Sequence, residues 1–174
     1  MKVFNKVFCI GLNKSGTTSL HKAFQILGFR SVHFIGKEGS IKDIIESNYK
    51  NNLPLLKGIE NYDAYSDWNH PSTNHLYKLF DKQYPGSKFI LNTRNMEDWL
   101  RSREKHVKRI DNLKELQLKY PNSDWYHMNR TAWKKEYEKV HKEIKAYFKN
   151  RPDDLLIMDV CQGDGWEKRC PFLQ

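Results

Sequence analysis

The clearest chemical pattern in the sequence is the segment GLNKSGTT at residues 11–18. It follows a short apolar run and precedes a stretch whose apolar residues have helical spacing. Glycines let a backbone curl so that successive N–H groups point inward, and the start of a helix adds unpaired donors and partial positive charge. The segment therefore predicts a loop that binds an anionic group such as a phosphate. A glycine-containing turn without a ligand is the alternative.

The position of the lysine distinguishes this segment from an ordinary nucleoside triphosphate loop. The common pattern G-x-x-x-x-G-K-[ST] has its lysine directly after the second glycine, where it reaches the β- and γ-phosphates. Here Gly11 and Gly16 keep the spacing and Thr18 keeps the hydroxyl, but Thr17 takes the place of the lysine. Lys14 lies earlier in the loop instead. We expect a shorter, diphosphate-like group, with Lys14 reaching its terminal part.

Strands alternate with helices along the chain. Apolar runs predict strands at residues 7–10, 31–35, 62–68, 89–91 and 155–158, the last fully buried. Apolar spacing predicts helices at 17–27 and 40–51, after Pro71, from Met96 with Asn95 as its cap, and through 133–147. This order predicts one α/β domain over residues 1–174, a P-loop-type three-layer α/β/α fold with a central, mostly parallel five-stranded sheet. Ligands bind such sheets at the carboxyl ends of the strands.

A second anion-binding pattern lies about 80 residues after the first. Arg94 ends the run FILNTR, and Ser102 follows eight residues later in the expected helix. An arginine offers a planar fork of donors that suits a dianion, and a serine adds a neutral donor. KSGTT after a strand resembles the 5′-phosphosulfate loop of sulfotransferases that use 3′-phosphoadenosine-5′-phosphosulfate (PAPS). The Arg94 and Ser102 pair is similar to the residues that bind the 3′-phosphate in that family.

The resemblance implies a reaction and a set of binding residues. The sulfuryl group of PAPS would pass to a hydroxyl or amine of a small-molecule, sugar or lipid acceptor, leaving 3′-phosphoadenosine-5′-phosphate (PAP), without a metal. Lys14 would be catalytic, because positive charge at the leaving phosphate oxygen lowers the barrier. The implied nucleotide-binding residues are Asn13, Lys14, Ser15, Gly16, Thr17, Thr18, Arg94 and Ser102.

The general base stays open between two residues. Asp67 and His70 follow the expected third strand, and the resemblance implies a base near that position. We favour Asp67 slightly, because it lies closer to the strand end; a structural role is the alternative for both. His33, after the second strand, is a candidate for the acceptor pocket, which loops at 36–60 and 110–130 are expected to shape. Three histidines in expected helices are predicted to be surface or packing residues: His21, His106 and His141.

The composition favours anionic partners. Thirty Lys and Arg against 21 Asp and Glu give a formal charge of +9, which suits a polyphosphorylated cofactor, a nucleic acid or an acidic membrane face. The first apolar run is too short for a signal peptide or membrane span, so we expect a soluble, cytoplasmic protein. The three cysteines, Cys9, Cys161 and Cys170, form no CxxC pair, and a disulfide or zinc site is not expected.

Two other functions compete with sulfuryl transfer. A P-loop kinase or NTPase could use Asp159, after the last apolar run, to hold Mg²⁺, although residue 17 lacks the lysine that such enzymes need. A basic, non-enzymatic module could bind nucleic acid through the runs at 101–109 and 134–149. No nucleic-acid motif accompanies those runs, so solvated helix faces explain them better.

Overall fold

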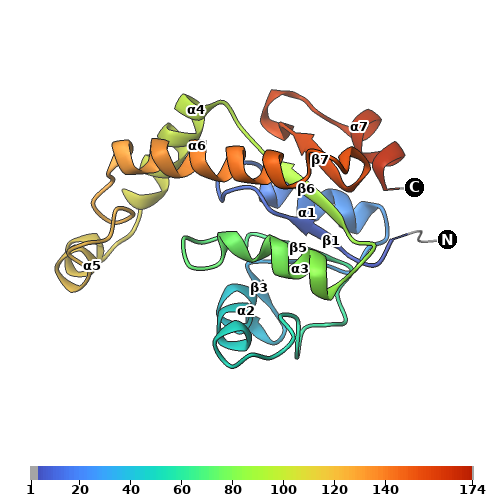
Figure 1. Cartoon of the computed structure of the whole chain (residues 1–174). Helices are drawn as coiled ribbons and strands as arrows, with labels where there is room; N and C mark the ends of the chain where they lie inside the picture. The colour runs from blue at the N-terminus through green and yellow to red at the C-terminus, as the bar shows by residue number, and fades with distance from the viewer. Residues whose placement is uncertain (1–3, 174) are drawn as a thin grey trace.

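A single parallel sheet forms the centre of the molecule (Figure 1). The computed structural model describes residues 4–173, with the side chains of residues 166, 169 and 170 outside that description. The five strands run in the order β2-β5-β1-β6-β7. Their bounds are β1 Val7–Cys9, β2 Ser31–His33, β5 Ala64–Ser66, β6 Lys88–Asn92 and β7 Leu155–Met158. All four pairings between neighbours are parallel, so the carboxyl ends of the strands lie along one edge.

Helices cover both faces of this sheet. The first face carries α1 (Thr17–Ile26) and α7 (Trp166–Phe172). The second carries α2 (Ile41–Lys50), α3 (Tyr77–Gln83), α4 (Met96–Val107) and α6 (Arg130–Tyr147). The predicted three-layer α/β/α fold with a five-stranded sheet is therefore confirmed. The remaining elements are the hairpin β3 (Ile35–Gly36) and β4 (Gly39–Ser40), α5 (Leu113–Lys119), and the 3-10 turns η1 (Asn74–Leu76), η2 (Pro152–Asp154) and η3 (Val160–Gln162).

Alternation along the strands divides the core between the two faces. In β1, Val7 and Cys9 pack with α1, whereas Phe8 packs with the helices of the second face. The ring of Phe8 lies 4.5 Å from that of Phe80 in α3 and 5.5 Å from that of Phe89 in β6. Such aromatic contacts add to the free energy of apolar burial. The second face holds the larger aromatic cluster and, above it, the long helix α6 (Figure 1).

Polar side chains cap three of the helices where the sequence places them. Asn95 accepts hydrogen bonds from the N–H groups of Glu97 and Asp98 at the start of α4, as predicted. Ser40 caps α2, and Asn129 caps α6 by accepting from the N–H of Ala132. These bonds satisfy donors that have no partner within the helix. The Asn95 cap thereby fixes the start of α4 directly after Arg94, which follows the end of β6.

Two of the predicted strands end two residues early, each directly before a residue with left-handed backbone. Phe34 has φ 58°, so β2 stops at His33, and the chain turns into the β3–β4 hairpin. Asp67 has φ 59°, so β5 stops at Ser66. A positive φ is uncommon for residues other than glycine and breaks the extended conformation of a strand. It turns Asp67 out of the sheet at the carboxyl edge.

The prediction that residues 155–158 form a fully buried strand is wrong. β7 pairs only with β6 and lies at the edge of the sheet. Ile157 is 42% exposed, and only Met158 is buried. An apolar run in a parallel sheet indicates a strand, but whether it is central depends on neighbours that the run itself does not contain.

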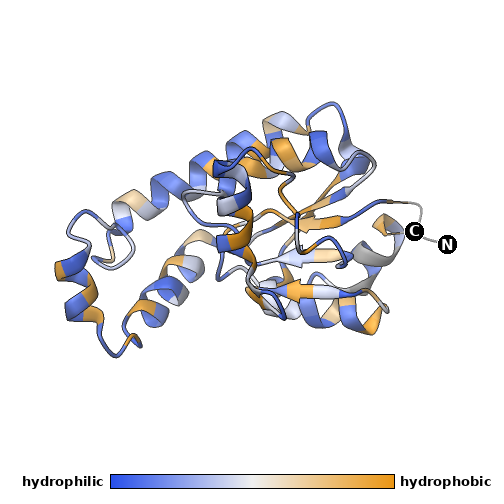
Figure 2. Cartoon of the chain, turned by 90° about the horizontal axis from the view of Figure 1, so that it is seen from below, coloured by the Kyte–Doolittle hydropathy of each residue, from blue (hydrophilic) through white to orange (hydrophobic). Residues whose placement is uncertain are grey.

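The segment that contains α5 lies away from the sheet, at the end of an arm, in both views (Figure 1 and Figure 2). No residue of α5 is buried. Among the described residues, no helix has the length and apolar character that crossing a bilayer requires. Cys9 is buried and Cys161 is exposed; the side chain of Cys170 lies outside the described part of the chain.

Gly11 lets the backbone after β1 pass close to the backbone of β6. Replacing this glycine tests how much stability depends on that close approach. A Cβ at this position would lie 1.9 Å from the Asn92 carbonyl oxygen in β6. We expect Gly11→Ala to lower the free energy of unfolding by about 3 kcal/mol, because backbone atoms must move apart. Gly28→Ala is the control: no atom lies within 4 Å of its Cβ, and its φ of 80° should cost only about 1 kcal/mol. Urea unfolding measures both, and equal losses would contradict the close approach.

Candidate active site

The loop between β1 and α1 is held by a buried side chain from β6. The Gly11 N–H donates to Asn92 Oδ1 at 2.9 Å, and Asn92 Nδ2 donates to the Leu12 carbonyl at 3.2 Å and to Ser15 Oγ at 2.6 Å. The Ser15 hydroxyl in turn donates to the Leu12 carbonyl. Asn92 and Ser15 are both buried, so these bonds form away from water. The loop is therefore fixed by the strand that leads to Arg94.

The backbone of the loop leaves hydrogen-bond donors free for a ligand. Lys14 and Gly16 are both left-handed, with φ 63° and 86°. The N–H groups of Gly16, Thr17 and Thr18, at the start of α1, donate to no acceptor in the described part of the chain. Free N–H groups at a helix start attract anions, as the sequence pattern predicts. This arrangement fits a phosphate or a sulfate ester.

Arg94 lies against the loop although 80 residues separate it from Lys14. Its Nη1 donates to the Lys14 carbonyl oxygen at 3.4 Å. The structure therefore brings the two predicted anion-binding segments together. Ser102 is half-buried in α4, and its hydroxyl forms no hydrogen bond with another described residue. Asn13 accepts a hydrogen bond from Trp99 Nε1 of α4 at 2.8 Å, through its backbone carbonyl.

The segment that carries Arg94 is supported by α6. The Tyr137 hydroxyl donates to the Arg94 carbonyl at 2.7 Å. His141 Nδ1 donates to the Tyr137 carbonyl, and its Nε2 lies 2.9 Å from the Thr93 hydroxyl. The imidazole also stacks on the Tyr137 ring at 3.9 Å. His141, predicted as a surface or packing residue, packs here and in addition fixes the strand end that presents Arg94.

A histidine and a carboxylate meet beside the start of α1. His33 Nε2 lies 3.6 Å from Asp67 Oδ2 and 3.1 Å from Thr17 Oγ1. The Thr17 hydroxyl also donates to Asp67 Oδ1 at 3.5 Å, and Thr18 Oγ1 lies 3.5 Å from His33 Nε2. His33 ends β2 and Asp67 follows β5, so the parallel sheet brings both to its carboxyl edge. The arrangement can accept a proton close to the anion-binding loop.

His106 is a site residue that the sequence pattern did not identify. Its Nδ1 lies 3.4 Å from Lys14 Nζ, the group expected to act on the anion. Burial, and then the charge of Lys14, lower the pKa of His106, whereas the charge of Asp67 acts in the opposite direction. Trp99, Arg103 and His106 share one face of α4 at steps of four and three residues. That spacing places the three residues together, but it does not indicate that their face meets the loop.

His70 lies outside this cluster. Its N–H donates to Thr73 Oγ1 at 3.1 Å, and no hydrogen bond or ion pair of the described residues joins it to the β1–α1 loop. Burial, and then the charge of Lys42, lower the pKa of His70. Asp159 caps η3 by accepting from the N–H groups of Cys161 and Gln162. Both bonds go to Oδ1, so one oxygen of this carboxylate serves as a helix cap.

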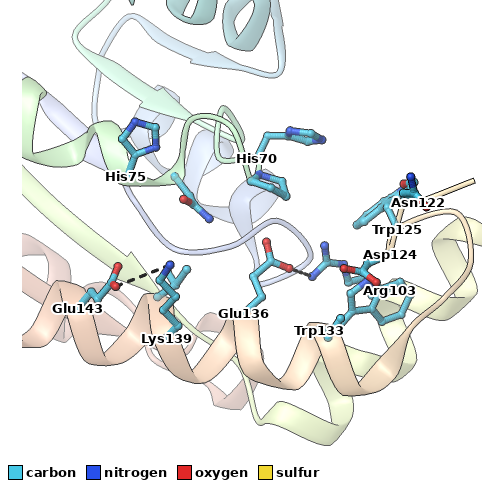
Figure 3. A pocket seen from close by; sticks show the side chains of 15 residues that line it. His70, His75, Arg103, Asn122, Asp124, Trp125, Trp133, Glu136, Lys139 and Glu143 are labelled. Carbon is cyan, nitrogen blue, oxygen red and sulfur yellow. Dashed lines mark hydrogen bonds and ion pairs between the residues drawn. The ribbon is translucent and has the colours of Figure 1, made fainter. Parts of the chain in front are cut away.

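A cavity of about 660 Å³ lies on the second face of the sheet, lined mainly by α6, residues 122–125 and the segment before α3. Figure 3 shows Glu136, Lys139 and Glu143 of α6 facing His70 and His75, with Arg103 and Trp125 at one end. Of the two loops expected to shape an acceptor pocket, the later one contributes residues 122–125, and none of residues 36–60 lines this cavity. No cluster of three His, Cys, Asp or Glu that could hold a metal is found within the described chain.

The fold and this site define an α/β domain whose free N–H donors lie at the carboxyl edge of the sheet, an arrangement suited to an anionic group. Comparison with known families agrees with the resemblance seen in the sequence: residues 6–174 match the model of the family described as Sulfotransferase domain. The chain belongs to this family, so it is a transferase whose reaction is sulfuryl transfer. No curated protein matches the chain.

The neutral form of His141 should make the fold sensitive to acid. Burial is the main cause that lowers its pKa below the ordinary 6.5. The folded state therefore binds a proton at His141 less readily than the unfolded state does. The stability that neutral His141 contributes is present above pH 6.5 and is lost as the pH falls through the pKa of the folded state. We expect His141→Gln to lose less stability than the parent chain as the pH falls below 6.5. Urea unfolding across this range measures the slopes; parallel slopes would contradict the prediction.

Proposed function

We propose that this sulfotransferase takes its sulfuryl group from PAPS and passes it to a hydroxyl or amine of a small acceptor. The observation that carries the proposal is the contact of the Arg94 guanidinium with the Lys14 carbonyl. A nucleotide charged at both its 5′ and 3′ ends needs two cationic sites at one edge of the sheet. Lys14 and Arg94 supply them, and the free N–H groups at the start of α1 supply neutral donors beside Lys14.

Each predicted binding residue has a role in this proposal. Lys14 and the N–H groups from Gly16 onward bind the 5′-phosphosulfate, and Arg94 with Ser102 binds the 3′-phosphate. Asn13 and Ser15 keep the loop in shape through their bonds to Trp99 and Asn92. The bound nucleotide supplies the sulfuryl group and a phosphate leaving group. Lys14 and the loop N–H groups stabilise the negative charge that develops on the leaving oxygen.

Asp67 is the proposed general base. Its carboxylate lies within reach of Thr17, at the edge where the anion binds, and His33 is its neighbour at 3.6 Å. The acceptor proton would move to an oxygen of Asp67 as the acceptor attacks sulfur. His33 orients the carboxylate through this pair. His70, the other candidate for the base, makes no contact with this group, so we assign it no part in proton transfer.

The two competing functions have less support. The carboxylate of Asp159 is used as a cap, and Thr17 stands where an ATP enzyme has its lysine. The basic runs of α4 and α6 are partly neutralised by acids between these helices. Glu97 pairs with Arg130 at 2.7 Å and with Lys134 at 2.9 Å. A surface with such cross-helix pairs is less suited to binding a phosphate backbone than a continuous basic stripe.

Binding of two nucleotides to one variant tests the role of Arg94. We expect Arg94→Met to weaken PAP about a hundredfold, because a charge-assisted contact with the 3′-phosphate is lost. AMP, which lacks that phosphate, should lose less than about threefold. Isothermal titration calorimetry measures both dissociation constants. Arg101→Met is the control, since this exposed residue of α4 pairs only with Asp98 among the described residues. Equal losses for PAP and AMP would contradict the assignment.

The proposed base is tested by transfer to water, which needs no identified acceptor. PAP release from PAPS is followed by chromatography. We expect Asp67→Asn to lower this rate about 10²–10⁴-fold, the usual contribution of a general base, with the PAP dissociation constant changed less than about threefold. Asp153→Asn, an exposed carboxylate that precedes β7 at the opposite edge of the sheet, serves as control. A loss of that size in His70→Asn and not in Asp67→Asn would overturn the assignment.

A further inference from the structure

The cavity beside α6 is connected to the anion-binding loop by two short chains of contacts. Trp125 lines the cavity, and its ring lies 5.7 Å from that of His106, which contacts Lys14 Nζ. Arg103 also lines the cavity, and its guanidinium carbon lies 4.7 Å from the centre of the Trp99 ring. Trp99 in turn donates a hydrogen bond to the Asn13 carbonyl. One residue therefore separates the cavity wall from Lys14. The cavity wall and the proposed site of sulfuryl transfer are therefore neighbours across His106.

Arg103 is the most unusual residue of the cavity wall. Its guanidinium carbon lies 4.6 to 4.8 Å from the rings of Trp99, Trp125 and Trp133, and the residue is only 3% exposed. Nη1 donates to Glu136 at 2.7 Å, whereas the buried Nε donates to no described residue. A buried charged group with an unpaired donor is costly. A ligand with oxygen acceptors could reduce that cost.

The rest of the wall offers both acceptors and donors. Carboxylates come from Asp124, Glu136 and Glu143, and amides from Asn74 and Asn122. Carboxylate and amide oxygens accept hydrogen bonds from hydroxyl groups, while amide N–H groups donate to them. The wall has three carboxylates and two cations, Arg103 and Lys139, so its formal charge is −1 with neutral histidines. This balance disfavours an anionic acceptor.

A ligand without polar groups would fit this wall poorly. A phenol or a lipid chain would cover its carboxylates and amides without offering them partners, which costs free energy for each group. A ring with several hydroxyl groups satisfies donors and acceptors on all sides, and its C–H faces can pack on Trp125. The volume of about 660 Å³ lies within the range of small-molecule sites and leaves room for more than one sugar ring.

We propose that this cavity is the acceptor site and that the acceptor is an uncharged carbohydrate. The identification of the cavity as an acceptor site rests on the proposed function; the affinity of its wall for a polyhydroxylated ring does not. One hydroxyl of the sugar extends past His106 toward Lys14 and Asp67, where its oxygen attacks sulfur and its proton passes to the carboxylate. Glu136, Glu143 and Arg103 bind the other hydroxyl groups.

Saturation-transfer NMR in the presence of PAP tests the class of ligand directly. The probes are the methyl glycosides of glucose, galactose, mannose and N-acetylglucosamine, compared with 2-naphthol and 1-octanol. At least one glycoside should receive saturation from the protein, and the two apolar probes should not. Binding of 2-naphthol or 1-octanol with no glycoside bound would overturn the proposal, and so would the absence of binding by every probe.

Variants on α6 locate the binding. We expect Glu143→Gln to weaken the bound glycoside about tenfold, the effect of one hydrogen bond to a charged group. Glu136→Gln should do the same but leaves Arg103 without its partner, so its folding is checked by circular dichroism. Glu138→Gln is the matched control, because Glu138 is exposed on the same helix and does not line the cavity. Equal affinity in Glu143→Gln and Glu138→Gln would place the sugar elsewhere and overturn the proposal.

The same samples separate this inference from the proposed function. PAP binding is measured by thermal shift before any sugar is added. If PAP binds but no glycoside does, the carbohydrate proposal fails and the use of PAPS stands. If a glycoside binds, Glu143→Gln weakens it and PAP does not bind, the cavity is a sugar site and the proposed function fails. Transfer of ³⁵S from labelled PAPS to the bound glycoside is the result that supports both.

Discussion

The site depends on one buried side chain, the carboxamide of Asn92. It accepts from the Gly11 N–H and donates to the Leu12 carbonyl and to Ser15 Oγ, so it joins the end of β6 to the loop after β1. Buried polar groups require partners, and here the loop and the strand end satisfy each other. Because Arg94 follows Asn92 by only two residues, the bonds that shape the loop also hold the backbone from which Arg94 reaches the Lys14 carbonyl. The β1–α1 loop and the end of β6, which are the two predicted anion-binding segments, are therefore held together without a ligand.

The parallel sheet supplies the second constraint. Its strand order places β1 between β5 and β6, so the segments after β5 and β6 flank the loop after β1. Asp67 comes from one side and Arg94 from the other. The left-handed backbone at Asp67 ends β5 just before this carboxylate. Residues held in such conformations need support from their surroundings, and the contacts of Asp67 with Thr17 and His33 provide it. The strand order therefore puts the carboxylate on one side of the loop and the arginine on the other.

Local patterns in the sequence were enough to predict most of the fold and the loop. The β1–α1 loop depends on glycine spacing, and the start of α4 on a cap at Asn95, both of which involve residues close in sequence. What the sequence did not reveal depends on distant partners. Residues 155–158 are as apolar as a central strand, but only the position of β7 at the edge of the sheet exposes Ile157. His106 lies in an ordinary helical pattern, and only the packing of α4 against the loop brings it to Lys14. Roles that arise from tertiary contacts carry no signal in spacing until the contact is known.

The helix α4 is the element that relates the loop to the cavity. Trp99, Arg103 and His106 lie on one face of it; Trp99 and His106 contact the loop, and Arg103 lines the cavity. Burial disfavours the charged form of Arg103 and so lowers its pKa. The ion pair with Glu136 raises the pKa and so favours the charged form. An apolar side chain at this position would avoid the cost of burying a charge. The guanidinium gives the cavity wall a hydrogen-bond donor, and it packs on Trp99, which contacts the loop that carries Lys14. Arg103 and Lys14 are thus joined by a chain of two packed contacts, Arg103 to Trp99 and Trp99 to the Asn13 carbonyl.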